Sequence, residues 1–322
     1  MRVRVSGRSS ELSRIQMHQV ADAIRAAAPS AEVVMNFRES LGDRMLEDPL
    51  WSMPEKGVFT EDFVEDLREG RTDVVVHSWK DLPTEPRIGT RVVATLPRAD
   101  VRDVLLVRRD LWSSVKPGAR ITILSSSPRR AHNLGTFLSW ALPVRNLAIE
   151  FVPVRGNVPT RLRKLHEGTH HGLVVAKAAL DRLMLSDDRC HRMILPISAN
   201  PTGAAQGALA MEIADGCDPE IASLIADLNA EVTFDEATRE REILRSYGGG
   251  CHQKIGVTVL TRGSERLISL RGVTDDGTIL ATPPWPEAAS DLGMWRRLAA
   301  EGEWVNGVDE GFFAPEVQAC SA

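Results

Sequence analysis

A short polar segment follows an apolar run in the first third of the chain. His77-Ser78-Trp79-Lys80-Asp81 comes directly after Val74-Val75-Val76. Three consecutive valines are typical of a buried strand, and open α/β sheets bind ligands beyond the carboxyl ends of their strands. Asp81, next to the cation of Lys80, is therefore a candidate for a positioned carboxylate. The alternative is a surface turn that carries an ion pair.

Two arginine-rich segments look like junctions between a strand and a helix. In Ser125-Ser126-Ser127-Pro128-Arg129-Arg130, Ser127 and Pro128 suit the cap and the first position of a helix. Arginines in a first turn oppose the positive end of the helix dipole, so a bound anion would explain them. Arg155-Gly156-Asn157-Val158-Pro159-Thr160-Arg161 is the second junction. Arginine can bind a carboxylate through two parallel hydrogen bonds. Solvated, exposed arginines are the alternative at both places.

One cysteine stands apart from the rest. Gly248-Gly249-Gly250-Cys251 places a thiol after three flexible glycines, although a helix stop before a strand would have the same pattern. The other cysteines are Cys190, Cys217 and Cys320, and no two form a CxxC pair, so neither a zinc nor a redox motif is indicated. We expect no metal site.

Charge is distributed unevenly along the chain. Residues 129–177 hold eight basic and two acidic residues, whereas the net charge of the whole chain is −5. A basic region in an acidic protein favours an anionic ligand, and a solvated helix face is the alternative. No GxxxxGK[ST] phosphate loop occurs, and no HExxH or GxSxG motif occurs either. These patterns favour an organic ligand with several carboxylates.

The elements that must position these residues predict an α/β fold. A length of 322 residues suggests two or three domains. A first unit is expected with strands at 3–5, 32–37 and 73–77 and helices at 9–28 and 60–70. A second has strands at 104–107, 120–124, 148–154 and 173–176 and helices from Ser127 and at 159–166. Residues 40–57 form a loop long enough to be functional.

The C-terminal part predicts a smaller α+β unit. A crossing segment at 195–207 precedes helices at 220–229 and 235–247, strands at 255–260 and 266–272, a turn at 276–277 and a helix at 291–301. No apolar run reaches the 18 residues of a membrane span, and the first residues do not form an apolar leader. We expect a cytoplasmic protein with no membrane partner.

Six motifs in this order resemble the porphobilinogen deaminase family. They are Gly7-Arg8-Ser9-Ser10 with Leu12 and Gln16, Lys56-Gly57-Val58-Phe59-Thr60 after Gly42-Asp43 and Pro49-Leu50, residues 77–81 with Pro83, residues 126–130, residues 155–161, and Gly249-Gly250-Cys251 with Ile255-Gly256. The sequence departs from the family pattern at Leu124, Pro128, Ala179 and Lys254 without losing a charge expected to do chemistry.

The resemblance implies three domains. Domain 1 would span 1–98 plus about 205–226, domain 2 would span 99–200, and domain 3 would span 228–322. The first two would resemble the lobes of type-II periplasmic binding proteins, with the active cleft between them, and the third would carry the cysteine loop.

The resemblance also implies a transferase of tetrapyrrole and haem biosynthesis. A dipyrromethane cofactor would be linked to Cys251, and four porphobilinogen molecules would be joined head to tail with loss of ammonia. Hydrolysis would then release the linear tetrapyrrole, hydroxymethylbilane. Each pyrrole carries an acetate and a propionate, which need fixed cations in a cleft.

Residue roles follow by the same resemblance. Asp81 would be catalytic. Cofactor contacts would come from Cys251, Lys80, Asp81, Ser126, Ser127, Arg129, Arg130, Arg155 and Gly156. Substrate contacts would come from Arg8, Ser10, Lys56, Arg155, Arg161 and Arg182.

Two other classes of protein remain as alternatives. The first is a non-catalytic, two-lobed binding protein for a carboxylated small molecule, which would need neither Asp81 nor Cys251. The second is a nucleic-acid binder, which the net charge of −5 and the single tyrosine, Tyr247, disfavour. We expect a monomer that does not bind nucleic acid.

Overall fold

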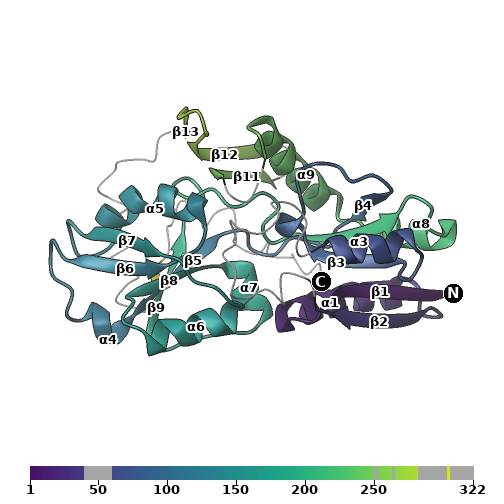
Figure 1. Ribbon diagram of the computed structural model, residues 1–322, viewed down its shortest axis with the longest axis horizontal. Coiled ribbons are helices and arrows are strands. Elements are labelled where there is room, and N and C mark those ends of the chain that lie inside the picture. The colour runs from purple at the N-terminus through teal and green to yellow at the C-terminus, as the bar shows by residue number, and fades with distance from the viewer. Residues whose placement is uncertain (40–59, 250–252, 263–264, 282–302, 305–322) are drawn as a thin grey trace, which may run out of the picture.

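The computed structural model describes residues 1–39, 60–249, 253–262, 265–281 and 303–304. In this part of the chain the strands form three sheets, and each sheet has helices packed against it (Figure 1). The predicted loop at 40–57 and the predicted helix at 291–301 lie outside the described residues.

The first lobe is a five-stranded sheet in the order β2-β1-β3-β10-β4. β2 and β3 run parallel to β1, whereas β10 is antiparallel to β3 and to β4. β10 comes from late in the chain, so the polypeptide returns to this lobe after building the second. The elements are β1 (Arg2–Arg8), α1 (Glu11–Ala27), β2 (Glu32–Arg38), α3 (Glu61–Arg68), β3 (Val74–Ser78), β4 (Thr90–Ala94), β10 (Leu209–Ala214) and α8 (Pro219–Asp227).

The second lobe is a six-stranded sheet in the order β14-β9-β5-β8-β6-β7. β6 is parallel to β7 and β8, and β5 is antiparallel to β8 and β9. The elements are β5 (Asp103–Arg108), α4 (Arg109–Trp112), β6 (Arg120–Leu124), α5 (Pro128–Ala141), β7 (Ala148–Val152), α6 (Val158–Glu167), β8 (Gly172–Ala176), α7 (Lys177–Arg182), β9 (Cys190–Leu195) and β14 (Glu303–Trp304).

The third unit packs one helix against a small antiparallel sheet, which lies above both lobes in Figure 1. Its elements are α9 (Glu231–Ser246), β11 (Lys254–Arg262), β12 (Glu265–Val273) and β13 (Ile279–Ala281). The turn between β12 and β13 contains Gly277 at φ +87°, as the predicted turn at 276–277 requires.

Two crossing segments join the lobes, and the third unit holds both of them. In the first, the Arg98 guanidinium donates to Glu240 of α9 at 2.7 Å and to the Gln206 carbonyl at 3.0 Å. In the second, the Val257 amide of β11 donates to the Thr202 carbonyl at 2.9 Å. The lobes therefore meet at a seam whose backbone is tied to α9 and β11.

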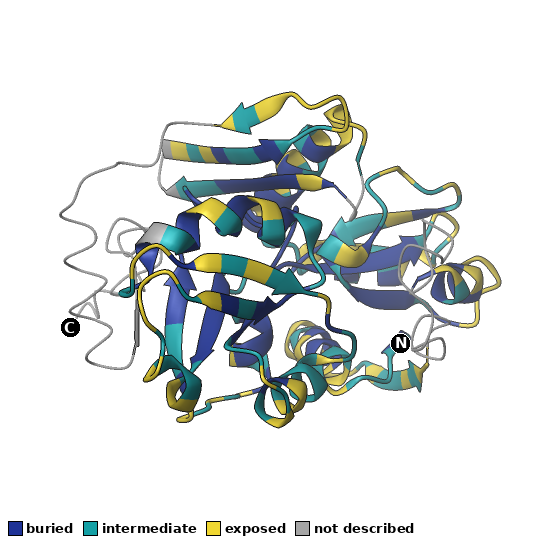
Figure 2. Cartoon of the chain, turned by 60° about the vertical axis from the view of Figure 1, so that its left-hand side comes forward, coloured by how far each residue is buried: buried dark blue, intermediate teal, exposed yellow. Residues whose placement is uncertain are grey.

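The cores lie on the faces of the two large sheets, whose central strands are mostly buried (Figure 2). One apolar cluster joins β1, β3 and β10 to α1 and α8, and two more cover the faces of the second sheet. None of the described helices has the length and apolar content that a bilayer crossing requires. The prediction of an α/β fold with two lobes and a small third unit is confirmed, whereas the exact domain boundaries stay a prediction.

Candidate active site

The segment after β3 carries Asp81 at an exposed position. β3 ends at Ser78, and one turn of 3₁₀ helix, Trp79–Asp81, follows it. Trp79 is 4% exposed and packs against Phe234 of α9 with their ring centroids 5.2 Å apart. The buried indole fixes the turn, so the carboxylate next to it is presented at the surface in a defined place.

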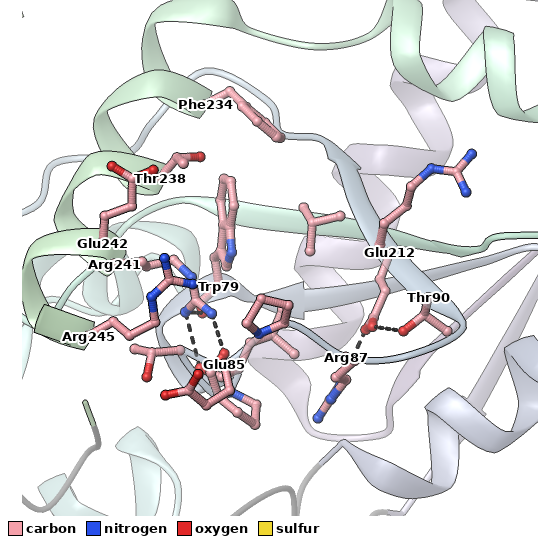
Figure 3. A pocket seen from close by; sticks show the side chains of 16 residues that line it. Trp79, Glu85, Arg87, Thr90, Glu212, Phe234, Thr238, Arg241, Glu242 and Arg245 are labelled. Carbon is pink, nitrogen blue, oxygen red and sulfur yellow. Dashed lines mark hydrogen bonds and ion pairs between the residues drawn. The ribbon is translucent and has the colours of Figure 1, made fainter. Parts of the chain in front are cut away.

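Arg241 of α9 holds this segment from the other side. Its guanidinium donates to the carbonyls of Trp79 (3.2 Å), Leu82 (3.1 Å) and Pro83. Figure 3 shows Arg241 beside Trp79 in a pocket of about 320 Å³, which lies between α9 and residues 79–92. The pocket thus borders the back of the Asp81 turn, and neither Asp81 nor any of the predicted cofactor and substrate residues lines it.

The N-terminus of α5 carries the first pair of predicted arginines. Ser127 caps the helix by accepting from the Arg130 amide, and Pro128 stands in the first turn, as predicted. Arg129 and Arg130 are only 6% and 7% exposed. Both donate to the carboxylate of Asp103, which is fully buried at the start of β5.

Ser126 links the ends of two neighbouring strands. Its hydroxyl donates to the Val154 carbonyl at 2.6 Å and accepts from the Val154 amide at 2.8 Å. A serine hydroxyl has one proton to donate, so this hydroxyl can donate to a ligand carboxylate only if the bond to the Val154 carbonyl breaks. The predicted cofactor contact of Ser127 has no such conflict, because its cap bond uses the hydroxyl as an acceptor.

The second predicted junction, at the start of α6, also has the expected form. Asn157 caps the helix by accepting from the Thr160 amide at 3.0 Å, and Gly156 has φ +110°. The Arg161 Nε donates to the Gly156 carbonyl at 2.8 Å. Burial, with Arg130 and Arg155 nearby, lowers the pKa of Arg161 to about 10.

Two further arginines of the predicted site have buried nitrogens without a hydrogen-bond partner among the described residues. They are Nη1 of Arg155 and Nε of Arg182. Arg182 ends α7, and its Nη2 donates to the Gly207 carbonyl at 2.8 Å. Burial lowers the pKa of Arg182 to about 10, although the nearby negative charge of Asp181 acts to raise it. A buried guanidinium with an unpaired donor favours an incoming anion.

The cationic groups of both lobes converge on one place. Burial lowers the pKa of Lys80, whose charge interacts with those of Asp81, Arg130, Asp103 and Arg129. Arg161 in turn interacts with Arg130, Arg155 and Asp81. These residues come from four segments of the sequence, and the structure brings each segment within electrostatic reach of at least one of the others.

Arg8 and Ser10 lie at the end of β1, next to the strand that leads to Asp81. β1 pairs with β3 in parallel, so their carboxyl ends share one sheet edge. Ser10 caps α1 by accepting from the Ser13 amide, and Gln16 of the same helix bonds Ser78 at 2.9 Å. The first lobe thus places Arg8, Ser10 and Asp81 on neighbouring elements.

Cys251 and Lys56 lie outside the described residues, although the stem of the cysteine loop does not. Gly249 has φ +53°, and a Cβ on it would overlap Thr84 Oγ1. The Gln253 side chain closes the loop by donating to the Tyr247 carbonyl at 2.7 Å. The segment leading to the thiol therefore passes Thr84, three residues after Asp81.

Three potential metal-ligating residues come together at the other end of α6. Ligand atoms of His166, Asp187 and Cys190 lie within 4.8 Å of one another. Asp187 already accepts from His166 at 2.5 Å and from Arg189 at 2.9 Å. Burial raises the pKa of the Cys190 thiol to about 12. We read this group as an ion-pair cluster, since an arginine occupies the carboxylate.

Sequence reasoning missed four residues that organise the site: Asp103, Asn200, Gln206 and Arg241. Asp103 is a single acid before an apolar strand, and nothing in the local pattern separates it from a surface residue. Gln206 lies in the predicted crossing segment at 195–207, to which no chemical role was assigned. A carboxylate at the buried end of a strand, in a chain with two adjacent arginines, was the one available signal.

Comparisons with known proteins identify the family. Residues 3–222 match the family model described as "Porphobilinogen deaminase, dipyromethane cofactor binding domain". A protein named porphobilinogen deaminase from Roseiflexus sp. (strain RS-1) is 34% identical over 300 residues, covering 92% of this chain and 94% of the relative. One of the same name from Acidothermus cellulolyticus is 36% identical over 308 residues, covering 93% and 88%.

Among solved structures, a TRAP periplasmic solute-binding protein from Desulfovibrio salexigens is similar over 76% of each chain, at 11% identity. The TM-score is 0.37, which does not show that the two folds are the same. The family match and the relatives are decisive without it. This chain belongs to the porphobilinogen deaminase family.

Proposed function

We propose that this chain is a hydroxymethylbilane synthase. It condenses four porphobilinogen molecules head to tail on a dipyrromethane primer bound through Cys251, and it releases the linear tetrapyrrole by hydrolysis. The observation that carries the proposal is that the charges of Lys80 and Arg161, which come from different lobes, both interact with Asp81, in a chain of this family.

The residues present fit a cofactor that bears several carboxylates. The unpartnered buried nitrogens of Arg155 and Arg182 need acceptors, and ionised carboxylates supply them with charge-assisted hydrogen bonds. Without a ligand these cations pay a desolvation cost that the lowered pKa of Arg161 and of Arg182 reflects. Bound carboxylates would reverse that shift.

The proposed contacts come from residues of both lobes. Lys80, Ser127, Arg129, Arg130, Arg155 and Gly156 hold the cofactor, with Ser126 accepting rather than donating. Arg8, Ser10, Arg155, Arg161, Arg182 and Lys56 hold the incoming substrate. When bound, the cofactor supplies a nucleophilic pyrrole carbon to which the chain is extended.

Asp81 has the main chemical role in this proposal. The substrate loses ammonia, whose nitrogen keeps the electron pair of the broken C–N bond, and its methylene carbon becomes positively charged. A new C–C bond forms there, and the attacking ring carbon then loses its proton. Carboxylate oxygens near the pyrrole N–H groups stabilise both positive species and can carry the proton.

Intact mass spectrometry of the purified chain tests the function. The protein should be heavier than its sequence by two linked pyrrole units, and Cys251→Ser should lose that increment. Mixed with porphobilinogen, the unsubstituted protein should release ammonia and a linear tetrapyrrole. Cys217→Ser is the matched control and should keep both the added mass and the activity.

The alternative, a two-lobed binding protein, predicts a different outcome. That protein would have the sequence mass and would bind porphobilinogen without releasing ammonia, and this result would overturn the proposal. We also propose that the chain acts as a cytoplasmic monomer without nucleic acid. Light scattering should then give a mass near the 35.4 kDa of one chain.

A further inference from the structure

Asp103 is the most heavily bonded carboxylate of the cationic cluster. It is 0% exposed and accepts five hydrogen bonds of 2.7–3.1 Å. Three come from Arg129 and Arg130, one comes from the Asn200 amide, and one comes from the Gln206 amide. An ionised carboxylate has about four lone-pair positions, so these bonds leave no place for a further donor. Asp103 therefore acts on the protein's own groups.

Gln206 joins this carboxylate to the other lobe. Its Nε2 donates to Asp103 at 2.8 Å and to the Val101 carbonyl at 2.7 Å, while its Oε1 accepts from Lys80 Nζ at 3.2 Å. The orientation of the amide is fixed chemically, because an ammonium can only donate and a carboxylate can only accept. Gln206 is 1% exposed, so water does not compete for these bonds.

The result is one bonded path across the seam between the lobes. It runs from the arginine pair at the start of α5 through Asp103 and Gln206 to Lys80, the residue before Asp81. We propose that Asp103 is a positioning residue, which acts through Gln206 to hold Lys80 and through direct bonds to hold Arg129 and Arg130. Together they set the cations of both lobes in one arrangement around the reacting groups. This inference rests on the proposed function.

Electrostatics gives the same assignment. The charged groups that interact with Lys80 are Asp81, Arg130, Asp103 and Arg129. Asp103 is a buried carboxylate whose charge interacts with Lys80 and with both arginines. Burial alone would raise the pKa of Asp103, but Arg130, Arg129 and Gln206 hold it well below its usual range. If that charge is removed, three cations face one another and Lys80 loses its proton more readily.

A direct test is the titration of Lys80 in the holoenzyme. The chain has six lysines, so reductive ¹³C-methylation gives a simple NMR spectrum in which Lys80→Arg identifies the Lys80 signal. In Asp103→Asn the Lys80 signal should titrate about one pH unit lower, and kcat should fall about tenfold while KM changes less. The alkaline limb of the kcat profile should move in the same direction. A purely structural role for Asp103 would lower stability but would not move this titration.

Two controls separate positioning from folding. Asp100→Asn removes a nearby carboxylate that bonds Arg102 at 2.7 Å, and it should leave the Lys80 signal unchanged. Asp103→Glu keeps the negative charge, so the Lys80 signal should titrate close to its value in the unsubstituted protein. If Asp103→Asn does not fold, Gln206→Leu decides the matter, since it removes the acceptor of Lys80 and leaves the arginine pair bonded to Asp103.

The outcomes are distinguishable. The inference is overturned if Asp103→Asn leaves both the Lys80 titration and kcat unchanged. If Asp103→Asn does not fold, the same result in Gln206→Leu overturns it. The proposed function fails separately, if the unsubstituted protein carries no added mass and does not consume porphobilinogen. A shifted titration with normal kcat would also count against positioning, because it would show that the arrangement does not matter for turnover.

Discussion

Two sets of arginines face the same site, and they differ in their partners. Arg129 and Arg130 share the buried carboxylate of Asp103. Arg155, Arg161 and Arg182 have no carboxylate partner among the described residues, and two of them keep a buried nitrogen without any hydrogen bond. The first set has a carboxylate partner before a ligand arrives, whereas the second does not. We infer that the paired arginines shape the site and that the unpaired ones provide most of the ligand's binding energy.

The largest expected effect concerns the carboxylate that interacts with both Lys80 and Arg161. Asp81→Ala should lower turnover by about 100- to 10,000-fold, the usual range for loss of an acid–base group, while the protein stays folded. Single-turnover rates and circular dichroism check the two parts. Near-normal turnover would show that Asp81 does not take part in the chemistry. The unpaired arginines would then not lie around a reacting group.

Substitution in the paired set should act on stability. Arg130→Leu leaves Asp103 with fewer partners, and breaking a buried pair costs about 3–5 kcal/mol of unfolding free energy. Urea denaturation measures this loss. Arg163→Leu is the matched control on the exposed face of α6, where the nearest carboxylate is 3.8 Å away, and it should change stability by less than about 0.5 kcal/mol.

Substitution in the unpaired set should act on binding instead. Arg161→Met removes a guanidinium that has no carboxylate partner among the described residues. A hydrogen bond to a charged group is worth about 1.5–3 kcal/mol, so KM for porphobilinogen should rise about 10- to 100-fold. Its unfolding free energy should change by less than about 1 kcal/mol, because no ion pair is broken. If Arg130→Leu and Arg161→Met behaved alike in both measurements, the division into two sets would be wrong.

The smallest expected effect is a difference in stability between substitutions of two glycines, one of which lies next to the paired Arg129. A Cβ on Gly256 of β11 would overlap the Pro201 carbonyl and come within 3.1 Å of Arg129 Cδ. Gly256→Ala should therefore cost about 1–3 kcal/mol of stability. Gly135 in α5 has open space around it, so Gly135→Ala should stabilise the helix by about 0.5–1 kcal/mol. Thermal unfolding of both variants measures the difference, and equal melting temperatures would mean that β11 does not constrain Arg129.

Much of the fold could be predicted because its signals are local. Ser127-Pro128 and Asn157 mark helix starts through cap chemistry, and the three valines of β3 mark a buried strand. β10 was missed because Leu209-Ala210-Met211-Glu212-Ile213-Ala214 consists largely of good helix formers. Its place between β3 and β4 is decided by burial on both sides, which no local pattern records.

The sequence could offer Asp81 and Arg155 as candidates because each stands out by its own type and position, and their roles stay predictions. The candidate site was not predictable where a residue acts through a hydrogen-bond partner that is distant in the sequence. Asp103 and Gln206 are 103 positions apart in the chain, and only the crossing between the lobes makes them neighbours. The cytoplasmic location and the monomeric state stay predictions, since no observation of the fold addresses them.

The three bonds from Arg241 have a mechanical consequence. α9 holds the backbone of the segment that carries Asp81, and the same helix ends at Ser246, just before the described stem of the cysteine loop. The Asp81 turn and the stem at Tyr247 are thus both attached to one helix. A displacement of α9 should therefore move the Asp81 turn and that stem together.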